Sequence, residues 1–181
     1  MASTDLATLE RKARAGYERA LLLRAVVGFA PALVLVVLAT WLNRRMTSAA
    51  VFGGVLFASG VVALWRGGAL RRAVLPGVLS GLLPLGFAII ANRGHFCASG
   101  HCSTYCLPAC TAGGVLAGVI VSTIARRRGL GLSFLAGASA LSMLTGAMGC
   151  SCAGASGIVG MVAGFAVGLV PQGLRALVRR R

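Results

Sequence analysis

The sequence predicts an all-α polytopic membrane protein with six transmembrane helices arranged as three hairpins. Hydrophobic residues make up 57% of the 181 residues and charged residues only 12%, which is too apolar for an ordinary soluble domain. Long uncharged runs are separated by short arginine clusters, and about 20 residues suffice for a helix to cross a hydrocarbon core roughly 30 Å thick. The predicted membrane helices span 25–43, 49–65, 74–92, 106–125, 130–149 and 155–174.

The segment before the first run, residues 1–24, is expected to form a cytoplasmic amphipathic helix. Apolar residues recur in it at spacings of three and four, and basic residues lie between them. Such a helix either lies on anionic headgroups at the membrane surface or docks a cytoplasmic protein. The docking candidates are Leu6, Leu9, Ala13 and Tyr17.

The first apolar run is expected to remain in the protein as a membrane helix. It is too long for the apolar part of a signal peptide, and no convincing small-residue cleavage site follows it. Residues 25–181 then form one six-helix transmembrane domain. Trp41 and Trp65 close the first and second runs, where aromatic rings favour the headgroup layer.

The second, fourth and sixth runs share glycine-rich stretches. "GGVLFASG" begins at Gly53, "GGVLAG" at Gly113 and "GMVAG" at Gly160. Because membrane helices associate through close backbone approach, we expect three hairpins of related design that pack on glycine faces. Met143, Met148 and Met161 are expected to be packing residues in the last hairpin.

The basic residues define an orientation for the six helices. With the N-terminus in the cytoplasm, 15 of the 18 basic residues fall on the cytoplasmic side, and only Arg44, Arg45 and Arg93 fall outside. This positive-inside bias supports an even number of crossings with both termini in the cytoplasm. The net charge of +15 therefore reflects membrane orientation, because the arginines form no single basic face for nucleic acid.

All six cysteines then share the outer face, in loops 93–110 and 150–154 on the periplasmic side of a bacterial inner membrane. The only two histidines, His95 and His101, lie on the same face. An even number of cysteines in an oxidising compartment predicts disulfides first. The cysteines are Cys97, Cys102, Cys106, Cys110, Cys150 and Cys152.

Three interpretations of this cysteine cluster remain open from the sequence. The cysteines are structural disulfides, a zinc or copper site helped by His95 and His101, or a redox pair that exchanges disulfides or senses oxidants. The disulfide and redox-pair interpretations require no cofactor. Neighbours four apart on a regular helix are too distant for a disulfide, so a bond from Cys106 or Cys110 to Cys150 or Cys152 is the easier pairing.

Acidic residues are confined to the region before the first membrane helix, at Asp5, Glu10 and Glu18. No predicted span has a central ionisable residue, which argues against a proton- or sodium-driven carrier. We therefore expect a protein that is not an enzyme and acts as a sensor or regulatory membrane subunit. The alternatives are a membrane thiol-disulfide oxidoreductase and a carrier for a thiophilic metal or sulfur compound.

The layout of the chain resembles the NrsF-like membrane anti-sigma factors. The resemblance rests on six membrane helices, a short cytoplasmic N-terminal segment and cysteines at outer helix ends in the "CLPAC" and "GCSC" stretches. It implies that residues 1–24 bind a cytoplasmic sigma factor and that the cysteines report on an extracytoplasmic stimulus. The expected partners are thus the lipid bilayer and a cytoplasmic regulatory protein, without direct contact to nucleic acid.

Overall fold

The computed structural model describes residues 2–42, 46–93, 102–150 and 154–178, and these ranges are almost entirely helical, with no strand. The predicted all-α class is therefore confirmed for this part of the chain. Its elements in chain order are α1 (Ala2–Leu42), α2 (Met46–Arg66), α3 (Gly68–Arg93), α4 (Cys102–Arg127), α5 (Leu132–Cys150) and α6 (Ala155–Val178).

Each predicted membrane run falls on one of these helices, with its ends shifted by a few residues. The largest difference is α1, which runs without interruption from Ala2 to Leu42 and so joins the predicted N-terminal helix to the first membrane run. The sequence contains no helix-breaking pair between them. Pro31 lies within α1 and does not end it.

Glycines with positive φ end two of the helices. Gly67 (φ 70°) and Gly68 (φ 61°) make the turn from α2 into α3. After α4, Gly129 has φ 60°, its N–H donates to the carbonyl of Arg126, and the N–H of Leu130 donates to the carbonyl of Ala125. This is the Schellman arrangement, which only glycine adopts without strain.

Four helices contain a stretch long and apolar enough to cross a membrane, judged by length and composition among the described residues. These stretches are Arg11–Leu38, Gly68–Ala91, Leu107–Arg127 and Leu132–Cys150. The apolar segments of α2 and α6, Ala50–Arg66 and Ala155–Val170, are shorter. The helices indicate a membrane protein.

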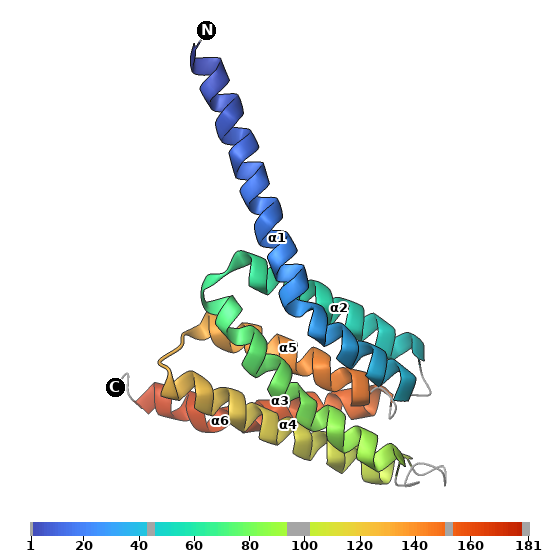
Figure 1. Cartoon of the computed structure of the whole chain (residues 1–181). Helices are drawn as coiled ribbons and strands as arrows, with labels where there is room; N and C mark the ends of the chain where they lie inside the picture. Colours follow the sequence, from blue (N-terminus) through green and yellow to red (C-terminus); the bar gives the residue numbers. More distant parts are fainter. Residues whose placement is uncertain (1, 43–45, 94–101, 151–153, 179–181) are drawn as a thin grey trace.

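Successive helices reverse direction, and the N-terminal half of α1 projects away from the other five helices (Figure 1). Helix α1 packs on α2, and α2 also packs on α5. The most extensive contacts join α4 to α6, α3 to α5 and α3 to α4, and smaller ones join α4 to α5 and α2 to α3. The third predicted hairpin is not a tightly packed pair, because α5 and α6 touch each other only lightly. Instead, α5 lies beside α3 and α6 beside α4, so each of these two pairs is parallel.

The contact between α4 and α6 depends on glycine, as the sequence predicted for glycine faces. A Cβ on Gly114 would overlap the carbonyl oxygen of Met161, and one on Gly164 would overlap the carbonyl oxygen of Thr111. A Cβ on Gly118 would lie 2.5 Å from the carbonyl oxygen of Phe165. Because backbone meets backbone here, α6 prefers α4 over its chain neighbour α5.

The contact between α3 and α5 combines glycines with buried hydroxyls. A Cβ on Gly81 would lie 2.7 Å from the carbonyl oxygen of Ser142. The hydroxyl oxygen of Ser80 lies 3.1 Å from that of Ser142 and 3.0 Å from the carbonyl oxygen of Gly77. Hydrogen bonds within the bundle therefore satisfy these polar groups away from lipid.

Candidate functional site

The site is built from the end of α5 and the second and third turns of α4. Residues 145–150 of α5 are all buried, so the last turn of this helix does not extend into solvent. Cys150 is the final residue of α5, and its side chain is 0% exposed. Cys110 lies two turns after the start of α4 at Cys102, and it is also 0% exposed.

A side-chain hydrogen bond joins Cys110 to Cys150. The two residues carry thiols in the structure and come from two different helices. The sequence allows four pairings between the two cysteine groups, and the fold brings this one together in the described part of the chain. The contact links α4 to α5 at the end of the bundle where α3 and α5 end (Figure 1).

The surroundings of the two thiols are apolar. Ala88 of α3, Ala147 of α5 and Met161 of α6 form one buried cluster with them. Partly buried Phe52 and Met143 pack against this cluster. Five helices therefore contribute side chains around the pair, which keeps bulk water and large reactants away from the sulfur atoms.

Met161 connects this cluster to the glycine contacts. Its thioether sulfur lies 2.5 Å from the position that a Cβ on Gly146 of α5 would occupy, and its backbone carbonyl lies against Gly114 of α4. A side chain of α6 is thus held between the two helices that carry the thiols. Met161 is a packing residue, 2% exposed, as its sequence context predicted.

Two adjacent thiols can form a disulfide when a two-electron oxidant is supplied. They offer only two ligands to a metal, whereas a structural zinc site takes four. Among the residues that the structure describes, no group of three or more histidine, cysteine, aspartate or glutamate side chains comes together. Cys97, Cys152, His95 and His101 lie outside the described residues.

Three cysteines of α4 are spaced four residues apart, and we refer to them as the α4 stripe. Helix α4 begins at Cys102 and continues past Pro108, so the backbone positions of Cys102, Cys106 and Cys110 recur every four residues along one face. The side chains of Cys102 and Cys106 are outside the described residues. Because the helix does not unwind at Pro108, neighbours within the stripe are unfavourably spaced for a disulfide.

The predicted docking residues lie on the projecting half of α1 (Figure 1). Ala13 is exposed and Tyr17 is 67% exposed, whereas the side chains of Leu6 and Leu9 are outside the described residues. Arg14 Nε lies 3.5 Å from Glu18 Oε1, one helical turn away. This half of the helix therefore presents its apolar and charged side chains away from the bundle.

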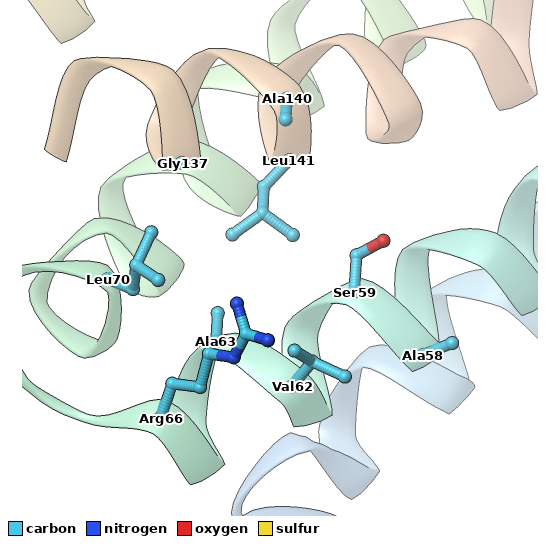
Figure 2. A pocket seen from close by; sticks show the side chains of 9 residues that line it. All are labelled: Ala58, Ser59, Val62, Ala63, Arg66, Leu70, Gly137, Ala140 and Leu141. Carbon is cyan, nitrogen blue, oxygen red and sulfur yellow. The ribbon is translucent and has the colours of Figure 1, made fainter. Parts of the chain in front are cut away.

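The sequence does not predict two grooves that the structure forms between helices. Figure 2 shows the first, between α2 and α5, with Arg66 extending into it. The second lies between α3 and α4 and includes Arg128. The sequence marks Arg66 and Arg128 only as indicators of membrane orientation. The spacing of Ser59 from Arg66 and of Ser80 from Arg128 forms no recognisable motif, because the second pair comes from two different helices.

Comparisons with known protein families, with curated proteins and with solved structures give no match.

Proposed function

We propose that this chain is a bacterial inner-membrane sensor in which Cys110 and Cys150 form a redox-responsive pair and the N-terminal half of α1 docks a cytoplasmic regulatory protein. The proposed topology has six membrane crossings, with both termini in the cytoplasm and the cysteines on the periplasmic side. The observation that carries the redox role is the hydrogen-bonded contact of two buried thiols from different helices.

The proposed topology is supported by helix length and by the distribution of charge. Helices α2 and α6 have short apolar segments, but their 21 and 24 residues extend about 32 and 36 Å, enough to cross the hydrocarbon core. Successive reversal of direction brings the C-terminal ends of α1, α3 and α5 to one end of the bundle (Figure 1). Fifteen of the 18 basic residues belong to the other side in this arrangement.

The proposed chemistry is oxidation of the pair by a hydroperoxide small enough to enter the bundle. The two thiols lose two electrons and two protons as the Sγ–Sγ bond forms. The hydroperoxide accepts them as its O–O bond breaks, giving water and an alcohol, or two waters from hydrogen peroxide. A dithiol small enough to enter the bundle reverses the step by thiol–disulfide exchange.

Bond formation changes the distance between two helices. An Sγ–Sγ bond of about 2.05 Å is much shorter than a contact across a hydrogen bond, so oxidation draws α4 and α5 together by on the order of 1 Å. Helix α5 packs on α2, and α2 packs on α1. Because α1 is one continuous helix, a change in its packing at the bundle moves its projecting half as well.

Burial distinguishes this role from that of a thiol-disulfide oxidoreductase. An oxidoreductase must expose one sulfur to the disulfide of a partner protein, since exchange proceeds through direct attack of thiolate on sulfur. Both Cys110 and Cys150 are 0% exposed within the described structure. The pair is therefore better suited to a diffusible oxidant than to a protein substrate.

The test is recovery of a cytoplasmic protein with the tagged full-length chain from membranes, before and after brief hydroperoxide treatment. We expect oxidation to change the recovery several-fold in the wild type and to have no effect in Cys110→Ala, while Cys106→Ala behaves as the wild type. Deletion of residues 2–20 should abolish recovery without preventing membrane insertion. Recovery that survives this deletion, or an oxidation effect that persists in Cys110→Ala, would contradict the proposal.

A further inference from the structure

A groove of about 350 Å³ lies between α2 and α5, within the size range of small-ligand pockets. Its walls are apolar except at Ser59 and Arg66, both on α2. In Figure 2 the Arg66 side chain reaches into the gap between the two helices and its guanidinium group lies below Leu141 of α5. Other lining residues are Val62, Leu70 and Gly137.

Arg66 belongs to a chain with few carboxylates. The three acidic residues all lie between positions 5 and 18, against 18 basic residues in the whole chain. The acid whose side chain is described, Glu18, already pairs with Arg14 at 3.5 Å. Among the described residues no carboxylate pairs with the guanidinium of Arg66, and an arginine binds a phosphate group particularly well.

A second groove repeats the same chemistry between α3 and α4. Its volume is about 380 Å³, and its walls are apolar except at Ser80 and Arg128. Arg66 ends α2 and Arg128 follows α4, so both arginines lie at the end of the bundle opposite the cysteine pair (Figure 1). Two independent grooves thus combine an apolar wall along the helices with an arginine at one end.

Trp65 marks the depth of the first groove. It is adjacent to Arg66 and 41% exposed, and tryptophan rings of membrane proteins concentrate in the headgroup layer. The guanidinium group of Arg66 is then at the level of lipid phosphates, and the apolar part of the groove extends from there toward the middle of the bilayer. This geometry matches an amphiphile that has a charged headgroup at one end and a hydrocarbon chain at the other.

We infer that each groove binds one anionic phospholipid, with its phosphate on Arg66 or Arg128 and an acyl chain along the apolar wall. Anionic lipids are attracted to basic residues at the cytoplasmic membrane surface by about 1 kcal/mol per arginine, which corresponds to roughly fivefold in affinity. Free phosphate would use the arginine but not the apolar wall. The inference requires a membrane location and is independent of the redox role of the cysteines.

The test counts lipids retained by the purified full-length protein in native mass spectrometry, with phosphatidylglycerol, phosphatidylcholine or inorganic phosphate added. We expect two phosphatidylglycerol molecules on the wild type, a roughly fivefold weaker affinity for one of them in Arg66→Gln, and for both in the double variant Arg66→Gln/Arg128→Gln. The matched control, Arg72→Gln/Arg127→Gln, removes the same charge from exposed positions that line neither groove and should retain two.

A second variant tests the apolar wall without changing charge. Ala140→Phe narrows the first groove from the α5 side and should lose one phosphatidylglycerol while Arg66 is intact. Equal retention of phosphatidylcholine, full displacement by inorganic phosphate, or loss of lipid in the control double variant would each overturn the inference. Cysteine oxidation does not enter any of these measurements, so their failure leaves the proposed sensing role untouched.

Discussion

At the residue scale, the pairing of Cys110 with Cys150 depends on how deeply each residue is buried. The sequence predicts which cysteines share one end of the bundle, and it favours bonds between the two cysteine groups over bonds within the α4 stripe. The sequence does not choose among the bonds between the two groups, because the choice depends on which residue ends α5 and on how the neighbouring helices bury it. Residues 145–150 are all buried by neighbouring helices, a tertiary effect without a local sequence signal.

Met161→Ala tests the packing that holds the thiols in place. This side chain is 2% exposed and contacts both helices of the pair, so its truncation leaves a cavity and should cost about 2–5 kcal/mol. Val162→Ala is the control, because Val162 is 39% exposed and should change stability by less than about 1 kcal/mol. The measurement is thermal unfolding in one detergent. Equal midpoints for both variants would contradict the packing described for Met161.

At the element scale, the sequence predicts all six helices because uncharged runs and arginine clusters alternate so regularly. Two features are beyond its reach. The fusion of the N-terminal segment with the first membrane run into α1 has no local marker, since both parts are helical and only their polarity changes. The partner of α6 is α4 rather than α5, because the glycines of α4 and α6 match in three dimensions.

Gly164→Ala tests the parallel pair of α4 and α6. The added Cβ meets the carbonyl oxygen of Thr111, a backbone atom that cannot rotate away, so we expect a loss of about 1–3 kcal/mol. Gly86→Ala is the matched control in α3, since nothing lies within 4 Å of its Cβ position. Alanine favours helix more than glycine does, so this variant should gain up to about 1 kcal/mol. Unfolding midpoints that shift in the same direction would refute the close α4–α6 contact.

At the scale of the whole molecule, composition and charge predict a membrane protein, and four helices have the length and composition to cross a bilayer among the described residues. The proposed orientation rests on the bias of the basic residues, and the reversal of direction between successive helices agrees with it. The arginines of the two grooves and the cysteine pair lie at opposite ends of one bundle. Their separation makes the two proposed sites independently testable.

Reporter fusions test the proposed orientation. A fluorescent protein joined after Gly129 or at the C-terminus should fluoresce, and alkaline phosphatase joined there should be inactive, since both positions are cytoplasmic in a six-crossing arrangement. Fusions after Arg93 should give the reverse pattern. Active phosphatase at the C-terminus together with fluorescence after Arg93 would exclude this topology.

The most direct measurement of the central claim is disulfide mapping in a chain that keeps only Cys110 and Cys150, with the other four cysteines changed to serine. Trypsin places these two residues in separate peptides, 94–126 and 129–175. Mild hydroperoxide treatment of membranes should join the two peptides, and dithiothreitol should separate them. A control chain that keeps only Cys102 and Cys150 should stay unlinked, because Cys102 lies about 12 Å further along α4 from Cys110. Absence of the 110–150 link, or equal linking in the control, would contradict the redox pair.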